Sequence, residues 1–81
     1  MSLDKEYALL IKRTSENIVY RRKMLGLTQK DMEKFGFDVK NYQKIEYGVH
    51  HYSLFTVFRL SRIFGCSIEE LIHDKSTKNS K

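Results

Sequence analysis

The sequence predicts an all-α protein made of five helices in a single small domain. Proline is absent, glycine occurs only four times, and no segment alternates apolar and polar residues long enough to form a half-buried strand. A chain of 81 residues must place most of its apolar side chains in one core, which leaves little room for a deep substrate cavity. We therefore do not expect an enzyme.

The first helix is predicted over residues 4–25, either as one long helix or as two helices in phase. At 100° per residue, six side chains fall on one stripe, and Gly26 then ends the helix. The stripe consists of Tyr7, Ile11, Thr14, Ile18, Arg22 and Leu25.

Each of the four later helices begins with a capping signal. The second is predicted at residues 28–35, the third at 38–47, the fourth at 53–64, and the fifth from the capping box "SIEE" at 67–70 to about residue 73. Glycine follows the second, third and fourth helices, as is usual at helix ends. The tail "DKSTKNSK", residues 74–81, has no apolar side chain and is expected to be a disordered basic segment.

Charge and composition limit the kinds of partner and the cell compartment that we expect for this protein. The net charge of +5 favours an anionic partner, although charge alone does not decide this. One cysteine excludes an internal disulfide, and no apolar run approaches the roughly 20 residues that span a membrane. We expect a cytoplasmic protein that has no contact with a membrane.

The third helix divides into two unlike faces. Tyr42, Ile45 and Glu46 fall near Val39 on one side, and that side is apolar apart from the glutamate. The opposite side carries no acidic residue and consists of Lys40, Lys44 and Tyr47, with Gln43 on its flank. This side is either an ordinary solvated face or a surface suited to base edges and phosphates in a major groove.

Two charges stand out on apolar faces. Arg22 lies on the stripe of the first helix, and Glu46 lies on the inward face of the third. Burying either charge alone is costly, whereas a pair is tolerated when it is hydrogen-bonded. The sequence therefore predicts a salt bridge between Arg22 and Glu46.

Three segments together resemble the phage-repressor and Cro-type helix-turn-helix family, often called the XRE family. They are "GLTQ" at 26–29, "KIEYG" at 44–48 and "SLFTVFRLSRIFGCSIEELI" at 53–72, and the resemblance covers residues 18–72. It implies a lambda-repressor-like DNA-binding domain at residues 18–73, preceded by a helical extension at 1–17. It also implies a transcriptional repressor whose third helix enters the major groove, and which binds double-stranded DNA as a homodimer on a palindromic site.

The resemblance also implies roles for individual residues. The residues expected to read bases are Val39, Lys40, Asn41, Gln43 and Lys44, with the two lysines as candidates for guanine. The residues expected to contact the DNA backbone are Thr28, Gln29, Lys30, Tyr47 and His51. Family members carry a matching arginine and glutamate at the positions of the predicted salt bridge.

The sequence departs from the family pattern at several places, including Glu33 in place of a small residue and Tyr52 in place of a proline, and three of the departures bear directly on the site. The segment from Thr28 to Gly36 is one residue short, which predicts either a shorter second helix or a changed packing angle. Val39 stands where several phage repressors have a polar partner for the second-helix glutamine, which would leave Gln29 free to rotate. Tyr42 replaces an aliphatic residue, so its hydroxyl needs a partner or a water if it is buried.

Other residue types give no sign of chemistry. Adjacent His50 and His51 do not converge on one metal ion without further ligands, so we expect no metal and no cofactor. Cys66 is expected to be a small core residue, and no small-molecule substrate is expected.

The dimer interface is less clearly marked in the sequence. In the fourth helix the predicted core residues are Leu54, Val57, Leu60, Ser61 and Phe64. Phe55 projects near two arginines and needs cover. This favours a symmetric dimer through the C-terminal helices, with the N-terminal extension packing locally or exchanging between subunits. A protein-binding module, an antitoxin and a restriction–modification controller remain alternatives on the same fold.

Overall fold

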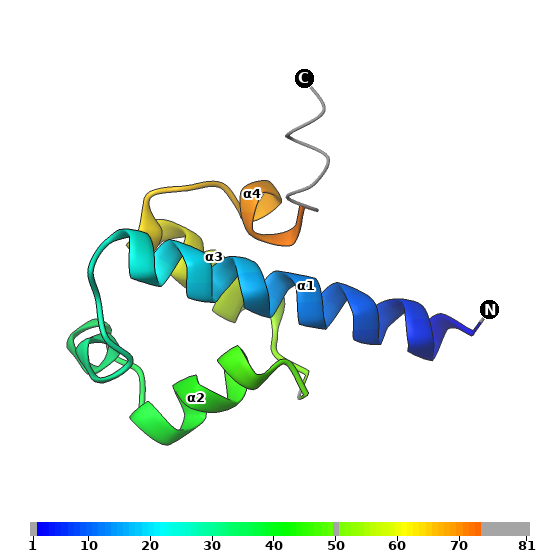
Figure 1. The fold of residues 1–81 in the computed structure, drawn as a ribbon, viewed down its shortest axis with the longest axis horizontal. Coiled ribbons are helices and arrows are strands. Elements are labelled where there is room, and N and C mark those ends of the chain that lie inside the picture. Colours follow the sequence, from blue (N-terminus) through cyan, green and yellow to red (C-terminus); the bar gives the residue numbers. More distant parts are fainter. Residues whose placement is uncertain (1, 50, 74–81) are drawn as a thin grey trace.

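The computed structural model describes residues 2–49 and 51–73. These residues form α1 (Leu3–Met24), η1 (Lys30–Phe35), α2 (Val39–Tyr47), α3 (Leu54–Phe64) and α4 (Ile68–Ile72). α1 crosses the middle of the molecule, with α2 on one side and α3 and α4 on the other (Figure 1). The predicted all-α fold of five helices is confirmed, whereas the predicted disordered tail, residues 74–81, lies outside the described residues.

α1 is one continuous helix of 22 residues, so the alternative of two separate helices is wrong. Its start is capped by Ser2, whose hydroxyl accepts from the backbone N–H of Lys5. The middle of the predicted stripe is buried, namely Ile11, Thr14, Ile18 and Arg22. Tyr7 and Leu25, predicted on the same stripe, are exposed because they lie near the two ends of α1, where fewer neighbours cover it.

The second helix differs from the prediction, because it is a 3-10 helix of six residues and not an α-helix. Thr28 still acts at its start, since its Oγ1 accepts from the N–H of Asp31 while its own N–H donates to the Asp31 carboxylate. A 3-10 helix rises about 2.0 Å per residue against about 1.5 Å in an α-helix, so the shortened segment still spans the distance to the turn. The missing residue is thus accommodated within the second helix.

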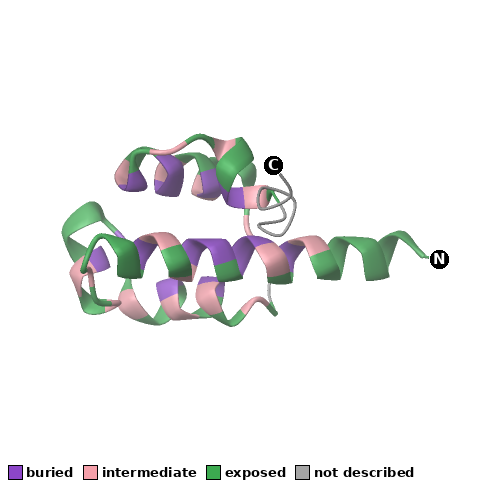
Figure 2. Ribbon diagram, turned by 45° about the horizontal axis from the view of Figure 1, so that its top comes forward, coloured by how far each residue is buried: buried purple, intermediate pink, exposed green. Residues whose placement is uncertain are grey.

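The core lies between α1 and the helices on both of its sides, where the buried positions of the elements face one another (Figure 2). Its buried members are Ile18, Met32, Phe37, Tyr42, Ile45, Val57, Leu60, Phe64 and Leu71. Cys66 is half-buried against this cluster. Leu54, predicted in the core, is 71% exposed because it is the first residue of α3 and lies at the rim of the packed region.

The arginines of α3 contact aromatic rings other than Phe55. The Arg59 guanidinium lies 4.1 Å from the centre of the Phe37 ring and donates to the carbonyl of Phe35 at 3.1 Å. Arg62 lies over the ring of Phe58. Arg59 therefore ties α3 to the turn between η1 and α2, which fixes the direction from which α2 leaves that turn.

Gly48, at the end of α2, has a positive φ of 73°, and a Cβ added there would lie 3.3 Å from the Cβ of Ser15. Ser15 is buried, and its hydroxyl donates to the carbonyl of Ile45 at 2.6 Å, so it has little freedom to move. We expect Gly48→Ala to lower the free energy of unfolding by about 2–4 kcal/mol, through left-handed strain and overpacking.

Gly26→Ala is the matched control, because Gly26 has a φ of 72° but a Cβ there would meet nothing within 4 Å. This control should lose only about 1–2 kcal/mol for the backbone conformation. Urea unfolding followed by circular dichroism measures both variants. Equal losses would contradict the close packing of α2 against α1.

Candidate nucleic-acid interface

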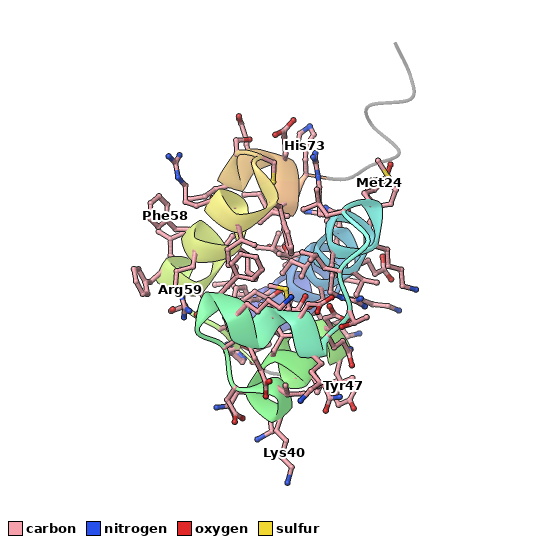
Figure 3. The ribbon with its side chains drawn as sticks, turned by 90° about the vertical axis from the view of Figure 1, so that its left-hand side faces the viewer. Met24, Lys40, Tyr47, Phe58, Arg59 and His73 are labelled. Atoms are coloured by element: carbon pink, nitrogen blue, oxygen red, sulfur yellow. The ribbon has the colours of Figure 1, made fainter. Side chains whose placement is uncertain are left out.

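The structure separates the α2 side chains into an inward and an outward set. Tyr42 and Ile45 are buried against the core, and Glu46 lies beside them with its side chain buried although the residue as a whole is partly exposed. Lys40, Asn41, Lys44 and Tyr47 are exposed. In Figure 3, the labelled Lys40 and Tyr47 both point away from the body of the protein. We call the set formed by Lys40, Asn41, Gln43, Lys44 and Tyr47 the outer face of α2.

Arg22 and Glu46 meet through two hydrogen bonds. The Nε of Arg22 donates to Oε2 at 2.6 Å and its Nη2 donates to Oε1 at 3.2 Å. The third nitrogen of the guanidinium, Nη1, donates to the carbonyl of Leu27 at 2.7 Å. The two side chains are only 9% and 5% exposed. This buried bidentate pair fixes α2 and the start of the helix-turn-helix relative to α1.

The pKa values of both groups respond to this contact. Burial alone would raise the pKa of Glu46, but hydrogen bonds, first of all from Arg22, outweigh burial and lower it. The hydrogen bond to Glu46 raises the pKa of Arg22 above its usual value. Both groups are therefore charged at neutral pH, and each stabilises the charged form of the other.

Gln29 is held in place, so the prediction that it rotates freely is wrong. Its Nε2 donates to Oε1 of Glu46 at 2.8 Å, and its Oε1 accepts from Nε2 of Gln43 at 3.1 Å. The sequence pattern did not indicate this connection, because it depends on how two segments meet in space. The only hint was one glutamine at the start of the second helix and another on the flank of the third.

This connection links the buried pair to the outer face of α2. Gln43 was predicted to read bases, and one of its amide N–H groups is instead engaged with Gln29. An amide has two N–H donors and a carbonyl acceptor, so each glutamine retains capacity for DNA. The contacts of Gln29 with a phosphate and of Gln43 with a base remain predictions. The hydrogen bonds orient both amide groups before any DNA is bound.

The start of η1 is less suited to phosphate than the resemblance implied. The Asp31 carboxylate accepts from the N–H of Thr28, and the pKa of Asp31 is lowered by hydrogen bonds from that residue. Lys30 is exposed and lies 3.5 Å from Glu33. A negative charge at the beginning of a short 3-10 helix opposes an incoming phosphate, so a phosphate contact in this segment depends on the side chains of Thr28, Gln29 and Lys30 and not on the helix start itself.

Two further predicted positions show distinct surroundings. Val39 is half-buried at the first turn of α2, which Asp38 caps by accepting from the N–H of Asn41 at 3.1 Å. His51 is exposed and its ring lies 4.8 Å from the ring of Tyr7. His51 therefore lies beside α1 as well as beside the end of α2.

The hydroxyl of Tyr42 does not find the expected partner. It is fully buried, and it has no hydrogen-bond partner of good geometry in the described part of the chain. Burial, and secondarily the neighbouring Glu46 carboxylate, raises the pKa of this hydroxyl. Tyr42 is therefore neutral throughout the physiological range and contributes packing rather than charge.

The lowered pKa of Glu46 predicts an acid limit on stability. A carboxyl whose pKa is lower in the folded than in the unfolded state stabilises the fold above the unfolded value, and this contribution disappears as the pH falls through the folded value. The ordinary value is 4.5, so the loss should begin near this pH and continue below it. Glu46→Gln should be less stable at pH 7 and should show a flatter decline below pH 4.5.

Urea midpoints measured between about pH 7 and pH 3 test this expectation. The exposed Glu16, changed to glutamine, is the control and should keep the slope of the wild-type protein. An unchanged acid slope in Glu46→Gln would contradict the assignment.

Comparison with known proteins agrees with this geometry. A family model described as "Helix-turn-helix" matches residues 18–71, about two thirds of the chain. No curated protein and no solved structure gave a significant match. The matched region begins inside α1 and extends into α4, so it contains η1, α2 and the buried pair. The family is regulatory and not catalytic. The chain therefore belongs to the helix-turn-helix family of the Cro and phage-repressor (XRE) type, and it is a DNA-binding regulator of that type.

Proposed function

We propose that this protein is a transcriptional repressor that binds a palindromic DNA operator as a dimer, with the outer face of α2 in the major groove. The residues proposed to read bases are Val39, Lys40, Asn41, Gln43 and Lys44. The residues proposed to contact the DNA backbone are Thr28, Gln29, Lys30, Tyr47 and His51.

The observation that carries the proposal is the composition of the outer face of α2, together with the hydrogen bonds that hold α2 and its glutamine in position. The only acidic residue of α2, Glu46, is turned inward and paired with Arg22, which leaves Lys40 and Lys44 without a carboxylate on their own helix face. Glu46 also orients Gln29, and Gln29 orients Gln43. The lysine and amide groups thus lie on the outer face of α2, while the buried pair of Arg22 and Glu46 holds the opposite face of α2 against α1.

The size of α2 also fits this role. Nine residues at 1.5 Å per residue give a helix of about 14 Å, comparable to the width of the major groove at about 12 Å. Lysine can donate to the guanine N7 and O6 atoms, and asparagine or glutamine can pair with adenine. Tyr47 is exposed at the end of α2, and in this proposal its side chain contacts a flanking phosphate.

Selection of bound duplexes from a random DNA pool tests the proposal. We expect one enriched motif with two symmetric half-sites about 10 base pairs apart, and affinity that falls steeply with salt. Recovery of unenriched DNA, with equal affinity for random duplexes, would contradict sequence-specific binding. Repression of a reporter that carries the selected site upstream of its promoter then tests the direction of regulation.

A second candidate is a protein-binding module in which DNA contact is secondary. It is favoured by the exposed apolar side chains at the start of α3, where Leu54, Phe55 and Phe58 all face solvent. Such a module would bind its protein partner with little dependence on salt. An antitoxin or a restriction–modification controller would combine such a surface with DNA binding, so those two roles are variants of the main proposal.

A further inference from the structure

The N-terminal part of α1 extends beyond the rest of the molecule (Figure 1), and its sequence places an apolar stripe along one side. Leu3, Tyr7 and Leu10 follow one another at helical spacing, so they lie on one side of the helix. Leu3 is 80% exposed, Tyr7 is 38% exposed and Leu10 is half-buried. Contact with another surface would remove these apolar side chains from water.

The stripe leads into an apolar groove of about 200 Å³. Its lining residues are Tyr7, Leu10, Ile11, Thr14, Tyr52, Leu54, Val57, Ile68 and Ile72. The groove thus lies between the N-terminal half of α1, the beginning of α3, and α4. Tyr7 and Leu10 belong both to the stripe and to the lining of the groove, so the stripe and the groove form one continuous apolar surface. The exposed Leu54 also lines the groove.

We propose that this surface is the dimer interface, and that its occupant is the α1 helix of a second copy of this chain, running antiparallel to the first. A two-fold axis on the side of the stripe, midway in height between Tyr7 and Leu10, places Tyr7 opposite the partner's Leu10. The same axis brings Leu3 over the partner's Thr14, at the floor of the partner's groove. Each copy then covers the groove of the other with its projecting helix end.

The charges beside the stripe are self-complementary in this arrangement. Glu6 and Arg13 are seven residues apart, so they lie two turns apart on the same flank of α1. In this antiparallel pair the same flanks of the two helices face each other, with Glu6 about 3 Å along the axis from the level of the partner's Arg13, within reach of the two long side chains, and the symmetry repeats the contact. In a parallel pair this flank would instead face the opposite flank of the partner, where Asp4, Ala8 and Ile11 offer Glu6 no basic partner, so these residues favour the antiparallel direction.

The structure positions Arg13 for this contact. Its Nε donates to the carbonyl of Ile72 at 3.2 Å, which holds the side chain at the rim of the groove. Arg13 and Glu6 form no ion pair within the described part of the chain. Glu6 also stabilises α1 by itself, because its negative charge lies near the positive end of the helix dipole. Exchanging the charges at positions 6 and 13 therefore distinguishes its contribution to the dimer from its contribution to the helix.

This inference deepens the proposed function, because it names the surface through which the proposed dimer forms. Sedimentation equilibrium of the full chain without DNA is the measurement, so the result does not depend on operator binding. We expect a reversible dimer whose dissociation constant rises at least about tenfold in Glu6→Arg and in Arg13→Glu, since each change places like charges together twice.

Charge exchange makes the test specific. The double variant Glu6→Arg with Arg13→Glu should regain most of the wild-type affinity, and an equimolar mixture of the two single variants should form heterodimers. Two single variants that dimerise as the wild type does, or a double variant no better than either single one, would overturn the proposed interface.

Leu3 and Leu9 provide a second, uncharged test. Both leucines are exposed on α1, so changing either to serine leaves the core intact, but only Leu3 lies on the proposed stripe. Leu3→Ser should weaken the dimer while Leu9→Ser should not. Equal effects, or a wild-type chain that stays monomeric at millimolar concentration, would overturn the inference. Binding of the monomer to a single half-site is measured separately, so a failure of the interface is distinguished from a failure of DNA binding.

Discussion

Replacing Arg22 with methionine should lower the free energy of unfolding by about 3–5 kcal/mol, because it leaves the Glu46 carboxylate buried without its partner. Glu46 is only 5% exposed, so water does not replace the two lost hydrogen bonds. The change also removes the donor to the Leu27 carbonyl. Methionine keeps an unbranched apolar stem but lacks the guanidinium, so the loss reports the broken pair together with the small space left at the end of the side chain.

Arg21→Met is the matched control, since it removes the same charge from the adjacent position of α1. Arg21 lies 3.7 Å from Glu70 in a partly exposed pair, which is expected to contribute at most about 1 kcal/mol. A double variant of Arg22→Met with Glu46→Leu should recover much of the loss, because no unpaired charge then remains. Chemical denaturation of all the variants completes a double-mutant cycle, and strictly additive losses would contradict the pairing.

Lys44→Ala should weaken binding to the selected DNA site by about 1–3 kcal/mol if Lys44 reads a guanine, and it should relax the preference at one base pair. Lys44 is exposed in the last turn of α2, and the helix face around it carries no carboxylate. A uniform loss across all sequences, with a salt slope smaller by about 1, would assign Lys44 to a phosphate instead.

Arg62→Ala is the control for charge alone. Arg62 is exposed on α3, which lies on the other side of α1 from α2 (Figure 1). It should change the affinity for the selected site little. An equal loss in both variants would mean that binding depends on net charge and not on the outer face of α2.

Most helix boundaries could be predicted from the sequence, because the signals for them are local. Ser53 and Ser67 cap their helices by accepting from the backbone three residues later, and Gly48 and Gly65 end helices in the left-handed conformation. The meeting of Arg22 and Glu46 also followed from a local fact, since each charge lies on an otherwise apolar face.

The features that could not be predicted depend on contacts between distant segments. Gln29 is oriented by Glu46 and Gln43, which are 17 and 14 residues away in the chain. Asn17, a residue without an assigned role in the sequence pattern, donates to the carbonyls of Leu71 and His73 and holds the end of α4 against α1. Helical periodicity gives the direction of a side chain, but it does not say whether a neighbouring element covers it.

The 3-10 geometry of the second element could not be predicted either, because it also depends on how distant segments pack. The hydrogen bonds between Thr28 and Asp31 are a local signal, but the helix begins at Lys30, later than the predicted start at residue 28. The connection between α1 and α2, which includes η1, must span a distance that depends on how these two helices pack. This distance cannot be predicted from the local sequence. The 3-10 geometry has a larger rise per residue than an α-helix, which suits a shorter segment.

The central claim is that the outer face of α2 is the surface that meets DNA. The most direct measurement is the change in backbone amide resonances when an isotopically labelled protein is titrated with its selected duplex. We predict that the largest changes fall on residues 39–47 and on residues 28–30, with small changes in α3 and in the projecting part of α1. Largest changes on α3, around Phe55 and Phe58, with α2 unaffected, would contradict the account.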